Sequence, residues 1–142
     1  MDFNPNKATF SDCLARIEKV VREVGLDTEK QIVTSRDDNC RRAQELLEIQ
    51  NVPKGFKKWQ LPVALRCESQ MFISVGAPGI KVPSHSHDEG PGIRFIMNGS
   101  IKYKDKELTG GDWMYIPKGV KYEFEVGPLG VLMCYCYCCC CA

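Results

Sequence analysis

The only two histidines of this chain are separated by a single residue. They are His85 and His87, in the stretch KVPSHSHDEGPGIRFIMNG that covers residues 81–99. If this stretch is a β-strand, both imidazoles point to the same face and lie about 6.5 Å apart along the strand. Two imidazoles so placed can share one metal ion. The alternative is a pair of solvated loop histidines just after Pro83, and the pair alone does not decide between these interpretations.

Glycines flank the histidine pair at a regular spacing. Gly79 precedes His85 with five residues between them, and Gly99 closes the following turn. This segment resembles the first motif of the cupin superfamily: a glycine, five residues, His-x-His, a short gap, a glutamate, six residues and a glycine. In this sequence Gly92 stands at the glutamate position.

A second segment, GDWMYIPKGVKY, resembles the second cupin motif. Gly111 is followed after five residues by Pro117, and Gly119 follows after one more. Tyr122 stands where the family has its third histidine. The two resemblances together cover residues 79–122 and imply a mainly β protein, a cupin jelly-roll barrel with an N-terminal α-helical extension.

The resemblance implies one divalent metal ion (Fe, Zn, Mn, Ni or Cu) held by His85 and His87. Two of the usual four ligands are missing, so water, substrate or other protein groups must fill the shell. Asp88 and Glu89 are the nearest carboxylates, and Glu89 is our additional ligand candidate; the alternative is two solvated residues beside an EGPG turn. Tyr122 either binds the ion or a bound water, or is a core aromatic that replaced a lost ligand.

Arg94 is the other candidate for chemistry. Strand alternation places it on the same face as Gly92, and a buried arginine requires an anion. That anion is a substrate carboxylate or an acidic side chain such as Glu123 or Glu125. A β-bulge at the GPG sequence would instead turn Arg94 to solvent. The absence of a glutamate side chain at Gly92 predicts room for a ligand beside the metal.

Helical periodicity in the first third predicts two helices that precede the β-rich part. The first covers residues 9–25, with Ser11 as N-cap and Gly25 as the terminating glycine. The second covers residues 36–50, with Ser35 as N-cap.

Short β-like runs separated by glycine and proline follow. They are residues 62–67, 71–76, 92–99, 100–104, 113–117, 122–126 and 131–137. We therefore divide the chain into a helical extension (1–55), a cupin β-barrel (56–137) and a cysteine-rich tail (138–142).

Six of the nine cysteines lie in the last nine residues, and the others are isolated. This distribution does not resemble a disulfide framework, so we expect reduced thiols. The soft-metal candidates in the tail are Cys138, Cys139, Cys140 and Cys141. A loose C-a-a-X lipidation signal and a tail that is a substrate for modification are the alternatives.

Charge and hydropathy limit the partners. The 19 Lys and Arg residues nearly balance 18 Asp and Glu residues, and they are scattered, so we expect no nucleic-acid partner. No apolar run approaches the about 20 residues of a membrane span, and no secretory signal is visible, so we expect a cytoplasmic protein without a transmembrane segment. The cupin resemblance also implies a homodimer.

Two functions follow from these features. The first is a metal-dependent enzyme, similar to cupin dioxygenases, lyases or isomerases, acting on a small organic acid or carbonyl compound. Arg94 would orient the anion and Tyr122 would give or take a proton. The second is a non-catalytic module that binds a metal or small ligand and carries a thiol-rich tail. The number of protein ligands on the ion would separate the two.

Overall fold

The computed structural model describes residues 7–138, which form two structural units. One unit contains residues 7–26 and 37–64, and the other contains residues 27–36 and 65–138. The segment 27–36 therefore belongs with the sheet, although it lies inside the predicted helical extension. Among the residues described, no helix has the length and apolarity needed to cross a membrane.

The first unit begins with helix α1 (Phe10–Val24). Its N-cap is Thr9, whose hydroxyl accepts from the Asp12 backbone N–H while the Asp12 carboxylate accepts from the Thr9 backbone. This capping box satisfies the free N–H groups of the first turn. The predicted N-cap, Ser11, is wrong because it lies inside that turn. Gly25 ends the helix in the left-handed conformation, as predicted.

Helix α2 (Asp38–Leu46) is shorter than the predicted 36–50 range. Its N-cap is Asp37 and not Ser35, because the Ser35 hydroxyl is bonded elsewhere in the sheet unit. The two helices pack through a small core made of Val20, Ala43 and Leu47.

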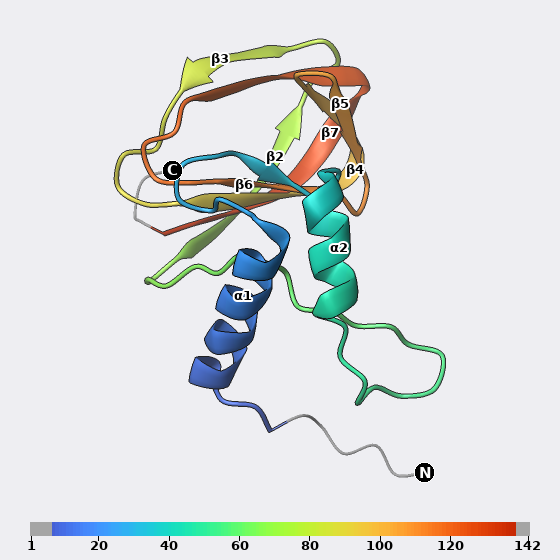
Figure 1. Cartoon of the computed structure of the whole chain (residues 1–142). Helices are drawn as coiled ribbons and strands as arrows, with labels where there is room; N and C mark the ends of the chain where they lie inside the picture. The colour runs from blue at the N-terminus through green and yellow to red at the C-terminus, as the bar shows by residue number, and fades with distance from the viewer. Residues whose placement is uncertain (1–6, 139–142) are drawn as a thin grey trace. The chain divides into compact units, whose positions relative to one another are not determined.

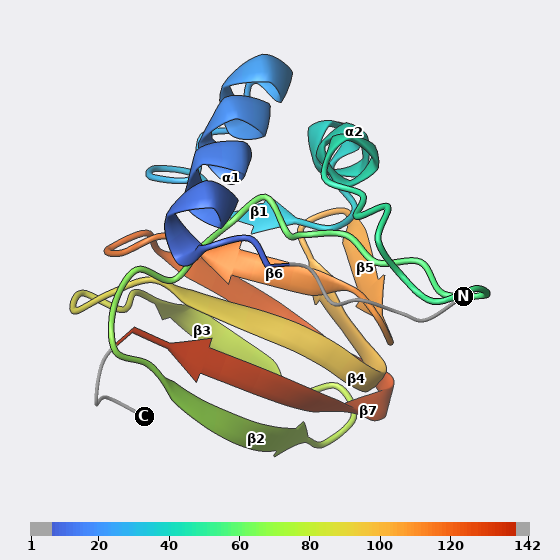
Figure 2. The same ribbon diagram turned by 90° about the horizontal axis from the view of Figure 1, so that it is seen from below.

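The second unit is a curved antiparallel sheet (Figure 1). Its strands are β1 (Val33–Thr34), β2 (Gln70–Gly76), β3 (Lys81–His85), β4 (Gly92–Tyr103), β5 (Lys106–Thr109), β6 (Trp113–Ile116) and β7 (Tyr122–Tyr137). The order is β1-β6-β4-β7-β2, and Figure 2 shows the last four side by side. β3 pairs with β7 and β5 pairs with β4. Within residues 7–138, β1 and β2 end this ladder, so the sheet curls around its core without closing.

Two strands are longer than predicted. The runs 92–99 and 100–104 join into β4, and the runs 122–126 and 131–137 join into β7. Residues 62–67 form no strand. β4 and β7 pair over most of their lengths. The register of this pairing shifts between Ile96 and Asn98 and again between Gly99 and Ile101. At such shifts a strand bends, so both strands contribute to both ends of the core.

The core of the sheet unit contains alternate residues of β4 and β7 together with β5 and β6. Its buried members are Ile96, Ile101, Tyr103, Leu108, Met114, Ile116, Tyr122, Phe124, Val126, Val131, Met133, Tyr135 and Tyr137. Three of its tyrosines, Tyr122, Tyr135 and Tyr137, have their rings close to His87, so the interior is polar at that end.

The four motif glycines share one backbone property. Gly79, Gly99, Gly111 and Gly119 all have φ between 72° and 94°. Only glycine adopts this conformation without steric cost, so the motif spacing marks the turns that connect the strands. At Gly99 a side chain would also collide with the backbone carbonyl of Gly130.

Asp112 connects β1 to the turn before β6. Its carboxylate accepts from the Ser35 hydroxyl (2.8 Å), the Arg36 Nε (2.9 Å) and the Thr109 backbone N–H (2.9 Å). Burial raises the pKa of Asp112, but these three donors outweigh it and lower the pKa overall. Asp112 is therefore ionised in the folded protein.

We expect Asp112→Asn to lower the free energy of unfolding at pH 7 by about 1 kcal/mol or more, since it weakens several hydrogen bonds. The pKa is lower in the folded state, so this stability is present above the unfolded value of about 3.9 and is lost as the pH falls through the folded value. Denaturant unfolding of parent and variant at pH 7 and pH 3 measures both effects. A difference that does not shrink at low pH would contradict the assigned role of the carboxylate.

Candidate functional site

The two motifs meet at the histidines. The Gly119 backbone N–H donates to the His87 carbonyl (2.9 Å), and His85 is the cross-strand partner of Tyr122. Tyr122, at the family's third-histidine position, thus lies beside the pair as the spacing implies. We call the residues gathered here the His-Arg-Tyr cluster: His85, His87, Arg94, Tyr122, Tyr135 and Tyr137.

His85 is the last residue of β3 and is half-buried. Its Nδ1 lies 2.8 Å from the Pro83 carbonyl oxygen. Because a carbonyl only accepts, Nδ1 must carry the hydrogen. In the neutral ring Nε2 then keeps its lone pair.

His87 follows the strand, and its ring centroid is 5.1 Å from that of His85. The Tyr122 hydroxyl lies 3.2 Å and the Tyr137 hydroxyl 3.4 Å from His87 Nε2. Burial lowers the pKa of His87 first, and the neighbouring His85 and Arg94 lower it further against an opposing effect of Asp88. At pH 7 this ring is therefore neutral.

Arg94 is buried inside the sheet unit, with 8% of its surface exposed. Its Nη2 and Nε donate to the Tyr122 hydroxyl at 2.9 and 3.3 Å, and its guanidinium carbon lies 3.9 Å from the Tyr135 ring centroid. Both arginine groups only donate, so the Tyr122 oxygen accepts twice and its own hydrogen is directed to His87.

The predicted acidic partners of Arg94 are wrong. Glu123 and Glu125 alternate with buried residues along β7 and are exposed on its outer face. No carboxylate within residues 7–138 forms an ion pair with Arg94. The bulge that would turn Arg94 to solvent is also absent at this position, since Gly92, Arg94 and Ile96 are all buried.

The room predicted beside Gly92 is already filled. A Cβ at Gly92 would lie 2.7 Å from Tyr135 Cζ and would collide with its hydroxyl oxygen. The Tyr135 phenol therefore occupies the space into which a glutamate ligand would extend. The expectation of an open ligand position at Gly92 is wrong for this reason.

Tyr135 is 2% exposed, and its hydroxyl has no hydrogen-bond partner among the described residues. The Tyr122 hydroxyl is near enough to raise the pKa of Tyr135. Since the Tyr122 hydroxyl is already bonded to Arg94 and His87, the Tyr135 hydroxyl is left without a partner of its own. Burial raises the pKa of Tyr135 strongly. Sequence reasoning did not include Tyr135 and Tyr137 in the site. The Tyr-Cys-Tyr alternation of β7 signals that they share a face but not that this face carries Arg94.

The donor set fits a metal ion only in part. His85 donates through Nδ1 to a backbone carbonyl, an arrangement common among metal-binding histidines, and its Nε2 is available. His87 is a second neutral imidazole, but its Nε2 accepts from the Tyr122 hydroxyl, so it can bind an ion only by giving up that hydrogen bond. Residues 7–138 hold no group of three or more His, Cys, Asp or Glu side chains suited to a metal. The pair therefore fits a weakly held ion and does not fit the four-ligand centre.

The carboxylates after the pair do not complete a shell. Asp88 and Glu89 are both exposed, and Asp88 accepts from the Ser86 hydroxyl at 2.8 Å. Glu89 forms no three-ligand group with His85 and His87.

The cysteines differ from the expectation of reduced thiols. Cys67 and Cys138 form a disulfide with a Cα–Cα distance of 5.5 Å. Cys138 is therefore not a free soft-metal ligand in this structure, while Cys139, Cys140 and Cys141 lie outside the described residues. Cys13, Cys40, Cys134 and Cys136 form no disulfide.

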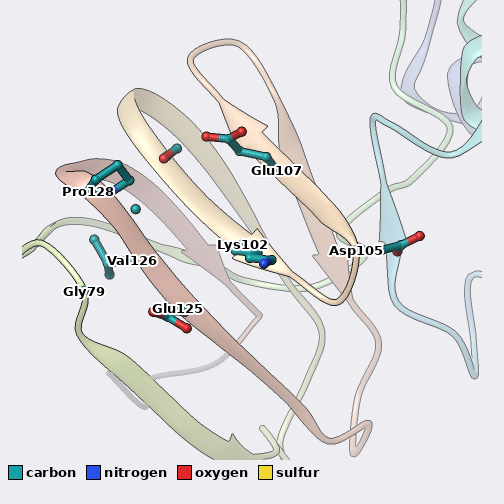
Figure 3. Close-up of a pocket in the computed structure, with 9 residues that line it drawn as sticks. Gly79, Lys102, Asp105, Glu107, Glu125, Val126 and Pro128 are labelled. Atoms are coloured by element: carbon teal, nitrogen blue, oxygen red, sulfur yellow. The ribbon is translucent and has the colours of Figure 1, made fainter.

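A separate pocket of about 530 Å³ lies between β4, β5 and β7 (Figure 3). Lys102 is the cross-strand partner of both Glu107 and Glu125 there, and Asp105 completes the charged lining. The pocket contains no member of the His-Arg-Tyr cluster, and its oppositely charged lining residues are exposed.

No family model and no curated protein match the chain. Solved structures do resemble it. An RmlC-like cupin from Shewanella frigidimarina is 21% identical over 66% of this chain and 84% of its own, with a TM-score of 0.44. A protein with a double-stranded β-helix domain from Klebsiella pneumoniae is 20% identical over 54% of this chain and 67% of its own, with a TM-score of 0.46.

A protein of unknown function with a cupin-like fold from Ralstonia eutropha is 19% identical over 50% of this chain, with a TM-score of 0.45. The match spans about half of that protein, 47%. Likeness of this extent concerns strand arrangement and carries no information on activity. The mainly β architecture with preceding helices that the sequence predicts is confirmed by the elements described above.

Proposed function

We propose that this chain with a cupin fold binds a small organic carboxylate through Arg94. One observation carries the proposal: Arg94 is buried and no carboxylate among the described residues pairs with it. A buried guanidinium is always charged and is costly without a counter-ion. An anionic ligand would supply that counter-ion.

The surroundings of Arg94 support an organic ligand over a simple anion. The guanidinium stacks on the Tyr135 ring, with the Phe124 ring centroid 5.3 Å away, so its faces are covered by aromatic groups. Both of its hydrogen bonds that the structure gives go to one neutral hydroxyl. The remaining N–H groups suit the two oxygens of a carboxylate.

A catalytic role for Tyr122 belongs to this proposal. Its hydroxyl links the Arg94 cation to the neutral His87 ring, so a proton can pass between the phenol and His87 Nε2. A ligand carboxylate on Arg94 would place its adjacent carbon near this pair. Proton transfer to or from that carbon is the reaction that such a pair supports.

A panel of small carboxylates and their neutral amides tests the proposal. We expect carboxylates to shift the ring signals of His85 and His87 in NMR spectra, and the matched amides to leave them unchanged, because only the carboxylate has a charge for Arg94. Because the chain has only two histidines, these ring signals are few and can be assigned by substitution. Equal responses to acid and amide, or none to any carboxylate, would refute binding at Arg94.

A metal ion on His85 and His87 is the second candidate, favoured by the His85 Nδ1 bond to Pro83. In this arrangement the ion would supply Lewis acidity beside the ligand, and the residues holding it would be the two imidazoles. The homodimer and the cytoplasmic location stay predictions.

The metal prediction is tested in a chain whose residues 139–141 are changed to serine, so that these tail thiols cannot bind metal while the Cys67–Cys138 disulfide is kept. We expect His85→Ala with His87→Ala to abolish stoichiometric metal, measured by elemental analysis after loading and desalting, while far-UV circular dichroism stays β-rich. The single variant Asp88→Asn is the matched control and should keep its metal. Equal metal content in the double variant would remove the site.

A further inference from the structure

Cys138 joins three segments of the sheet unit. Its disulfide reaches Cys67, in the segment before β2, and its backbone N–H donates to the Pro91 carbonyl at 3.0 Å. Gly90 lies directly against it, since a Cβ there would be 2.8 Å from Cys138 Cβ. The end of β7, the segment before β2 and the segment 88–91 are thus held together at one residue.

These segments lead directly into the His-Arg-Tyr cluster. Tyr137 precedes Cys138, and its ring centroid is 4.7 Å from that of His87. Residues 88–91 connect His87 to β4, which carries Arg94. The position of Cys138 therefore limits the movement of two parts of the cluster.

The disulfide is open to attack from one side. Cys67 is exposed and lies outside the strands, whereas Cys138 is 5% exposed. Since Cys67 is the exposed partner, we expect a thiolate to attack its sulfur, with Cys138 as leaving group. The ladder pairs that begin at Gln70 and Tyr137 do not depend on this bond, so its cleavage would act locally.

We propose that the Cys67–Cys138 disulfide is a thiol-responsive latch on the His-Arg-Tyr cluster. A dithiol reductant cleaves the bond in two steps: one thiolate attacks Cys67 and releases Cys138, and the second thiolate displaces Cys67. The reductant becomes a cyclic disulfide, and both cysteines take up a proton. Cys138 then separates from Cys67, and Tyr137 and residues 88–91 become free to move around His87.

The state of such a bond is set by thiol–disulfide exchange with external thiols. In a reducing compartment the latch would be open, and in an oxidising one it would be closed.

The test uses the full chain with Cys139→Ser, Cys140→Ser and Cys141→Ser, so that Cys138 is the only tail partner of Cys67. The two histidine ring signals are recorded by NMR before and after dithiothreitol, without any carboxylate, and His85→Gln assigns them. Mass spectrometry of peptides confirms the linked and reduced states. Cys13→Ser, which removes a thiol that forms no disulfide, is the matched control.

We expect reduction to displace the His87 ring signal, and Cys138→Ser to show the displaced position without reductant and no further response. Hydrogen exchange of the Cys138 amide should accelerate at least tenfold on reduction, while residues 113–116 stay protected. Unchanged histidine signals and exchange after confirmed reduction would overturn the latch, as would the absence of the Cys67–Cys138 peptide pair from the oxidised protein. Neither readout depends on a ligand, so failure of the latch and failure of carboxylate binding are separate results.

Discussion

Arg94→Met is expected to weaken binding of a small carboxylate by about 30-fold or more, equivalent to about 2 kcal/mol. The reason is that Arg94 is the buried cation of the cluster and has no carboxylate partner among the described residues. Methionine keeps much of the side-chain volume between Tyr135 and Phe124 but removes charge and donors. Isothermal titration with the best carboxylate of the panel measures the loss.

Stability separates this effect from simple misfolding. Replacing a buried charge by an apolar side chain of similar volume is often neutral or stabilising, so Arg94→Met should unfold at the same or a higher denaturant concentration. Arg94→Lys keeps the charge but loses the planar fork and its hydrogen bonds, and should bind with intermediate affinity. Equal affinity of the parent and Arg94→Met would mean that the ligand, if any, binds elsewhere.

The fold was predictable because its signals are local. Gly79, Gly99, Gly111 and Gly119 sit where the backbone needs positive φ, and such positions are visible in a sequence as spaced glycines. A helix cap was predicted wrongly where a residue distant in the sequence forms a hydrogen bond with the proposed capping side chain. Ser35 resembles an N-cap, but its hydroxyl is bonded to Asp112, which is 77 positions away.

Sequence reasoning could indicate which residues of the His-Arg-Tyr cluster are neighbours but not what fills the space between them. Motif spacing put Tyr122 beside His85 and His87, and strand alternation allowed an inward Arg94 while a bulge left the opposite orientation open. Motif spacing does not show which side chain fills the space of an absent glutamate. Gly92 therefore suggested an empty ligand position. The register of β4 with β7 sets Arg94 opposite Tyr135, and this pairing over a long sequence separation fills the opening.

The disulfide was missed for a similar reason. Cysteine spacing in the tail does not indicate a framework, and Cys67 appears isolated in the sequence. The two residues meet only because β2 and β7 pair with Gln70 opposite Tyr137, which brings the flanking cysteines together. A pairing register of this kind depends on the whole sheet and not on either segment.

The packing of Tyr135 against Gly92 leads to the last prediction. Gly92→Ala should lower the free energy of unfolding by about 1–3 kcal/mol, the usual cost of overpacking, because the new methyl group would meet the phenol carbon at 2.7 Å. Tyr135→Phe should leave stability unchanged or raise it, since it removes a buried hydroxyl without a partner. Gly110→Ala, whose Cβ would approach the Met97 carbonyl group, with its oxygen at 3.2 Å, is the control and should cost less.

Combining the two substitutions tests whether the tyrosine hydroxyl, and not the backbone, makes position 92 intolerant. In the Tyr135→Phe background Gly92→Ala should cost less than in the parent by about 1 kcal/mol, because contacting residues are energetically coupled. The relief is partial, since the ring carbons stay close. Denaturant unfolding of all four proteins of the cycle measures the coupling. Strictly additive costs would mean that the Tyr135 hydroxyl does not occupy the space of the missing glutamate.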